Sequence, residues 1–226
     1  MSLQKWGGAV ALLEACTYIF GFVLFFVVLD SSGYEAPERY LEFIIQNRDS
    51  YFLGYLVSGI VFSFALIVLV QANYQRFKQV SPELMRFTAV VGYLWVFMVL
   101  SSSFIFLTGL EALVKYHAID ATQALTINRT VNTIVDALGG GIELVGAVWV
   151  LAISYIGVKN KIYGAFVHYW GALVGIAGVL TLFSGLSFLA TNMFFEISTA
   201  IFGLGQIVWF ILLGIAMLND APKGAE

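Results

Sequence analysis

The sequence predicts an all-α integral membrane protein, a polytopic bundle of six transmembrane helices. Of its 226 residues, 60% are hydrophobic and only 11% are charged, whereas soluble domains carry about 25% charged residues. Six apolar stretches reach the roughly 20 residues that a helix needs to cross a bilayer. A helix suits lipid because it satisfies its own backbone hydrogen bonds. The stretches are approximately residues 8–29, 52–74, 87–113, 131–157, 163–190 and 197–218.

The connections between these stretches are short, which predicts a single transmembrane domain over residues 1–226. The first connection is the longest and contains a segment, about residues 37–47, that begins with Pro37. Proline is favoured in the first turn of a helix, and apolar residues such as Leu41 and Ile44 share one face of it. We expect a short interfacial helix that serves either as a surface anchor, the simpler interpretation, or as a lid over an external opening.

Lysine and arginine predict the orientation, because they accumulate in cytoplasmic loops. If the N-terminus is cytoplasmic, seven of the eleven lie inside and four outside, so we expect both termini in the cytoplasm. The inside residues are Lys5, Arg76, Lys78, Arg86, Lys159, Lys161 and Lys223. The outside residues are Arg39, Arg48, Lys115 and Arg129.

Composition also excludes several partners and sites. A net charge of −3 argues against nucleic acid, which basic surfaces bind. Cys16 is the only cysteine, which excludes an internal disulfide and a cysteine-based metal cluster. The expected partners are the lipid bilayer and either other membrane subunits or further copies of the chain.

The stretch 131–157 is unusual because it carries Asp136 and Glu143, seven residues apart, with Gly139–Gly141 between them. A charge at bilayer depth is costly and usually faces protein or water. Residues seven apart share a face of a continuous helix in left-handed packing. We therefore expect both carboxylates to point into the bundle.

Other apolar stretches hold single polar residues with a similar setting. Glu14 lies one turn before Tyr18, whose hydroxyl could donate to it. His168 shares a face with a row of glycines, which recur every seven residues from Gly164 to Gly185 and let helices approach closely. Gln206 lies near the middle of the last stretch. The predicted site is the cluster Glu14, Tyr18, Asp136, Glu143, His168 and Gln206.

Two interpretations of this cluster remain. In the functional one, the acids line a cavity and bind a cation, a proton or a polar ligand. In the structural one, neutral carboxyl groups, the imidazole and the amide hydrogen-bond between helices and specify packing. A lone histidine such as His168 is more often a partner of a neighbouring acid or carbonyl than a proton shuttle.

The functional interpretation predicts a protein that binds or transports a small molecule, ion or proton. The alternative is a non-catalytic membrane subunit or assembly partner of a larger complex. An enzyme is less favoured, because no nucleophile–base pair or metal constellation is visible. The sequence leaves any cofactor unknown.

The last two stretches resemble a known family. They read FVHYWGALVGIAGVL at residues 166–180 and IFGLGQIVWFILLG at residues 201–214. These segments are similar to a bacterial family of small six-span inner-membrane proteins that is known only as a domain of unknown function. The resemblance implies six spans and a bacterial inner membrane, and it implies no activity or site residues.

Overall fold

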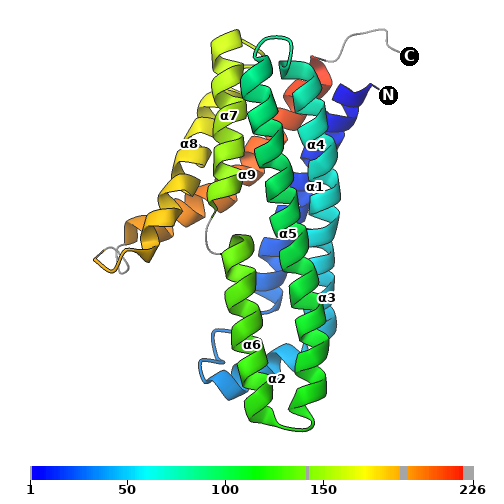
Figure 1. The fold of residues 1–226 in the computed structure, drawn as a ribbon, viewed down its shortest axis with the longest axis vertical. Helices are drawn as coiled ribbons and strands as arrows, with labels where there is room; N and C mark the ends of the chain where they lie inside the picture. The colour runs from blue at the N-terminus through cyan, green and yellow to red at the C-terminus, as the bar shows by residue number, and fades with distance from the viewer. Residues whose placement is uncertain (1, 141–142, 189–192, 221–226) are drawn as a thin grey trace. The chain divides into compact units, whose positions relative to one another are not determined.

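The computed structural model describes residues 2–140, 143–188 and 193–220, and every regular element among them is a helix (Figure 1). The predicted all-α class is therefore confirmed. The elements are α1 (Leu3–Val23), η1 (Leu24–Val28), α2 (Pro37–Gln46), α3 (Arg48–Tyr55), η2 (Leu56–Val61), α4 (Phe62–Phe77), α5 (Pro82–His117), α6 (Ala121–Val135), η3 (Asp136–Gly140), α7 (Leu144–Asn160), α8 (Ala165–Thr181), η4 (Leu182–Gly185) and α9 (Met193–Asn219). The segments η1, η2 and η3 are π-helical turns, and η4 is a 3-10 turn.

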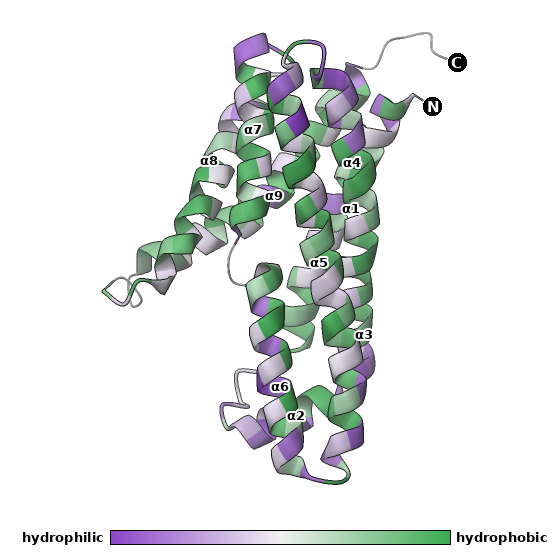
Figure 2. Ribbon diagram, in the orientation of Figure 1, coloured by the Kyte–Doolittle hydropathy of each residue, from purple (hydrophilic) through white to green (hydrophobic). Residues whose placement is uncertain are grey.

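Six helical stretches in the described part of the chain are long and apolar enough to cross a membrane, which confirms the predicted number. They cover Leu3–Val28, Arg48–Phe77, Pro82–His117, Ala121–Asn160, Ala165–Gly185 and Met193–Asn219. Several exceed the predicted apolar stretches because polar turns continue the helices. The 36 residues of α5 span about 54 Å at 1.5 Å per residue, more than the roughly 30 Å of hydrocarbon. Hydrophilic turns also recur along α6 (Figure 2).

The chain divides into two compact units. Unit 1 comprises Met1–Cys16, Ser63–Phe97 and Ile142–Glu226, and unit 2 comprises Thr17–Phe62 and Met98–Gly141. The single domain expected over residues 1–226 stays a prediction.

Close contacts between helices build unit 1, where α8 packs against both α7 and α9. Figure 1 shows these three helices together. A Cβ on Gly178 of α8 would lie 2.7 Å from the Cβ of Ala147 on α7, so this approach requires glycine. The predicted glycine row is only partly a packing surface, because a Cβ on Gly164 or Gly185 would meet nothing within 4 Å. Trp149 and Trp209 are fully buried, with ring centroids 5.7 Å apart.

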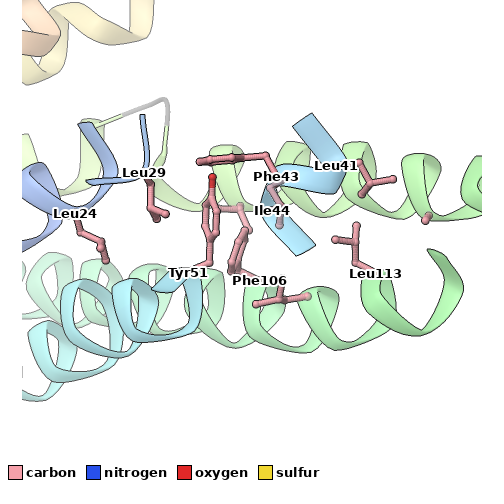
Figure 3. Close-up of a cluster of buried hydrophobic side chains, with 11 residues drawn as sticks. Leu24, Leu29, Leu41, Phe43, Ile44, Tyr51, Phe106 and Leu113 are labelled. Atoms are coloured by element: carbon pink, nitrogen blue, oxygen red, sulfur yellow. The ribbon is translucent and has the colours of Figure 1, made fainter. Parts of the chain in front are cut away.

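Unit 2 has its own apolar core, drawn in Figure 3. The helix expected at 37–47 is confirmed as α2, Pro37–Gln46. Its residues Leu41 and Ile44 are 1% and 2% exposed and belong to the same cluster as Tyr51 and Phe106. The apolar face of α2 therefore packs against the core of unit 2.

The segment expected as one helix over 131–157 is interrupted. The α6 helix ends at Val135, η3 follows, and α7 begins only at Leu144. Within η3, Gly139 has φ +129°, a conformation that residues with a Cβ rarely adopt. The continuous helix from which the shared face of Asp136 and Glu143 was predicted is therefore interrupted at Gly139. The two acids belong to unit 2 and unit 1, respectively.

Candidate functional site

Unit 2 contains a pocket of about 350 Å³ that Asp136 helps to line. Its wall comes from η1 and the residues after it, from α2, α3 and α5, and from the end of α6. Ligand pockets commonly measure about 300–1,000 Å³, so this volume suits a small molecule. The lining residues are Phe25, Leu29, Ser31, Tyr40, Tyr51, Tyr55, Phe106, Asn132, Val135 and Asp136.

Aromatic rings form much of this wall and hold one another in place. Tyr55 stacks on Phe106 with ring centroids 3.7 Å apart and planes 7° apart. Phe25 packs against Tyr55 at 5.9 Å and against Tyr51 at 6.0 Å. Figure 3 shows Tyr51 and Phe106 beside each other at the centre of the apolar cluster. The rings therefore join the pocket to the core of unit 2, which makes the wall rigid.

The polar residues of the pocket come from the turn after η1, from α2, from α3 and from the end of α6. Asn132 and Asp136 are four residues apart at the end of α6, so they lie on the same side of the helix. The hydroxyls of Tyr40 and Tyr51 are close enough to share a hydrogen bond. Tyr55 lines the same pocket as Asp136. These groups provide hydrogen-bond donors and acceptors around one carboxylate.

A turn after η1 positions the remaining polar residue, Ser31. The Ser32 amide N–H donates to the Asp30 carboxylate at 3.0 Å, and this bond holds the pKa of Asp30 below its ordinary value. The charged turn thus fixes the backbone on either side of Ser31.

All three π-helical turns of the described chain lie beside the pocket. Phe25 belongs to η1, Tyr55 immediately precedes η2, and Asp136 begins η3. A π-turn adds a residue to a helix and rotates the side chains that follow it, and such turns are frequent at functional sites. Of these turns, η1 contributes Phe25 and η3 contributes Asp136 to the pocket lining.

Hydrogen bonds at the N-terminus of α6 and along it stabilise the helix that carries Asn132 and leads into Asp136. Asp120 is its N-cap residue, and its carboxylate accepts hydrogen bonds from the N–H groups of Thr122 and Gln123. Thr133 donates its hydroxyl to the Arg129 carbonyl one turn earlier at 2.8 Å. The Asn132 amide donates to the Asn128 side chain at 3.4 Å, which leaves the Asn132 side-chain oxygen as an acceptor.

The six residues predicted as one cluster are divided between the two units. Unit 2 contains Tyr18 and Asp136, and unit 1 contains Glu14, Glu143, His168 and Gln206. Tyr18 packs edge-on against Phe62 with centroids 5.6 Å apart. Of the six, Asp136 is the one that lines the pocket.

His168 in unit 1 closes the connection between α7 and α8. Its Nε2 lies 2.6 Å from the carbonyl oxygen of Ile162, so Nε2 carries the proton and donates. The connection needs such support because Lys161 and Tyr163 have φ of 52° and 59°, which is unfavourable for residues with a Cβ. The imidazole also stacks on Tyr163 at 6.2 Å. This geometry is that of the structural alternative.

The other polar residues of unit 1 are also held within helix packing. Glu14 and Gln206 are fully buried. Neither amide atom of Gln206 has a hydrogen-bond partner among the described residues. Glu143 is the N-cap residue of α7, and its backbone N–H donates to the Thr181 hydroxyl at 3.3 Å.

Sequence reasoning missed most of the pocket. The aromatic residues were not predicted as site residues, although Tyr51 and Tyr55 are spaced to share a helical face, as are Asn132 and Asp136. These spacings were the available signal. As for metals, no group of three or more histidine, cysteine or acidic side chains that could hold an ion occurs in the part of the chain described.

Comparison with known proteins identifies the family and gives no activity. No curated protein and no solved structure matches this chain. A family model described as a domain of unknown function (DUF4386) matches residues 6–214, which is most of the 226-residue chain. With its six apolar helices, the chain is a membrane protein that belongs to the DUF4386 family.

Proposed function

We propose that this membrane protein binds a small molecule or ion in the pocket of unit 2 and transports it. The supporting observation is that Asp136 lines a pocket of about 350 Å³ together with Tyr40, Tyr51 and Tyr55. A pocket with apolar walls and a few convergent polar groups is the usual form of a small-molecule site. Asp136 carries the binding in this proposal.

We further propose a bacterial inner membrane as the location, with both termini in the cytoplasm. The excess of lysine and arginine on one side supports this orientation, with seven residues against four. Reporter fusions at the C-terminus test it. A fluorescent protein is expected to fluoresce and alkaline phosphatase to stay inactive, and the reverse pattern would contradict the orientation.

Thermal unfolding in lipid nanodiscs tests binding, because a ligand that binds only the folded state raises the melting temperature. Small cationic, neutral and anionic solutes would be compared on the wild type, on Asp136→Asn and on Glu38→Gln. Glu38 is an exposed acid of unit 2 outside the pocket lining, so it is a matched control. We expect stabilisation of the wild type and of Glu38→Gln, and at least a tenfold weaker response of Asp136→Asn.

The alternative function, a subunit or assembly partner, makes the opposite prediction. Asp136→Asn would then behave as the wild type does, and a second polypeptide would copurify after gentle extraction. Uptake into proteoliposomes separates transport from binding alone: a bound solute that never accumulates would leave a binding protein and contradict transport.

A further inference from the structure

We propose that the ligand of the unit 2 pocket is a small organic ammonium ion held by Asp136 and the surrounding aromatic rings. The inference rests on the proposed function and names the chemical class of its ligand. The lining combines one carboxylate with five aromatic side chains: Phe25, Tyr40, Tyr51, Tyr55 and Phe106.

Charge is the first argument. Among the described residues that line the pocket, Asp136 is the one charged side chain, and no lysine or arginine accompanies it. A cleft lined by charge of one sign concentrates ligands of the opposite sign and repels those of its own. The pocket therefore selects cations over anions and neutral solutes.

The aromatic wall is the second argument. Aromatic rings attract cations through the negative potential of their faces, and aromatic cages are the recurring binding site for methylated ammonium groups. Phe25, Tyr51, Tyr55 and Phe106 are linked by ring contacts of 3.7–6.0 Å, so they form one continuous aromatic surface. Organic ammonium ions keep much of their charge on an apolar body, which suits such a surface.

Size and ligand type argue against an inorganic ion. Magnesium and calcium are held by several oxygens at 2.0–2.6 Å, including more than one carboxylate in strong sites. Here one carboxylate borders about 350 Å³, which a bare ion would leave largely filled with water. An ammonium ion that carries a few carbon atoms can contact both the carboxylate and the apolar wall of the pocket.

The polar groups suggest a hydroxyl or N–H on the ligand. Ser31, Tyr40 and Asn132 lie in the same wall as the rings. Each can accept a hydrogen bond. Because these acceptors lie beside the carboxylate, a hydroxylated ammonium such as choline is a suitable probe.

Calorimetric titration of the full chain in nanodiscs tests the proposal. The probes are choline, its neutral carbon analogue dimethylbutanol, potassium and magnesium. We expect saturable binding of choline, with affinity at least tenfold above that of dimethylbutanol. Phe106→Leu removes one ring of the aromatic wall and should weaken choline binding about tenfold. Phe104→Leu is the matched control, because Phe104 lies on the same helix but is half exposed and outside the pocket lining.

One further variant keeps the test decisive if Phe106→Leu unfolds. Phe25→Leu removes a partly buried ring of the pocket lining. We expect it to weaken choline binding several-fold. Equal binding of choline and dimethylbutanol would overturn the ammonium proposal. Binding of potassium or magnesium that requires Asp136, without choline binding, would overturn it and leave the proposed function intact. Binding of no solute in any class would overturn both.

Discussion

Glu14, His168 and Gln206 of unit 1 are fully buried, whereas Asp136 of unit 2 lines a pocket. His168 is fully buried against Gly157, and its ring nitrogen is bonded to a carbonyl. Asp136 is exposed to a pocket of about 350 Å³. Both are polar residues in apolar stretches, so composition alone does not separate them. The space around each side chain separates them. We therefore expect substitutions of His168 to change stability and substitutions of Asp136 to change ligand affinity.

The largest stability effect is expected from Gly157→Ala. An added Cβ would overlap the imidazole of His168, which is fixed by its bond to Ile162. We expect a loss of about 1–3 kcal/mol in the free energy of unfolding, as for overpacked cores. Gly164→Ala is the matched control, because a Cβ there meets nothing within 4 Å. Equal melting temperatures of the two variants would show that unit 1 is less tightly packed than described.

A smaller loss is expected from His168→Leu. The substitution removes the donor to the Ile162 carbonyl, which leaves a buried acceptor without a partner at a cost of about 1–3 kcal/mol, partly offset by the apolar replacement. Ligand affinity in unit 2 should stay unchanged. Urea or heat unfolding measures the first quantity and titration the second. A variant of normal stability that no longer binds ligand would make His168 a site residue.

Tyr51→Phe is expected to act mainly on the ligand. The ring contacts with Phe25 and Phe106 are kept, while the hydroxyl beside Tyr40 is lost. We expect stability within about 1 kcal/mol of the wild type and a several-fold change in affinity for a hydroxylated ligand. Unchanged affinity would remove this hydroxyl from the site.

The smallest effect is expected from Arg76→Gln in unit 1. Arg76 pairs with Asp220 at 2.6 Å and lies 5.8 Å from the centre of the Tyr163 ring. Both charged side chains are partly exposed, at 33% and 44%, and such pairs contribute about 0–1 kcal/mol. A much larger loss, measured by unfolding at low and high salt, would mean that the pair supports the strained Tyr163 connection.

The fold could be predicted well because placing polar groups in lipid costs free energy within each helix. Each spanning helix must therefore be apolar along its own sequence. Each apolar stretch predicts one transmembrane helix, and Pro37 with the spacing of Leu41 and Ile44 predicts α2. The break at Gly139 was not predicted, because the apolar stretch 131–157 has the length and composition of one continuous spanning helix. The three consecutive glycines were the contrary signal.

The pocket could be predicted only in part, through Asp136. Its tyrosines come from α2 and α3, far from Asp136 in the chain, and only tertiary packing brings them together. Tyrosine in a membrane protein is also common as an interfacial anchor, so its presence alone indicates no site. His168 and Gln206 are polar in apolar surroundings as Asp136 is, and only their burial separates them from it.

The most direct test compares Asp136→Asn with His168→Leu for both choline affinity and unfolding temperature in nanodiscs. Our account predicts that Asp136→Asn binds choline at least tenfold more weakly and unfolds at nearly the wild-type temperature. It predicts that His168→Leu unfolds at a lower temperature and binds choline with nearly wild-type affinity. Wild-type affinity in Asp136→Asn, or loss of binding in a fully stable His168→Leu, would contradict it.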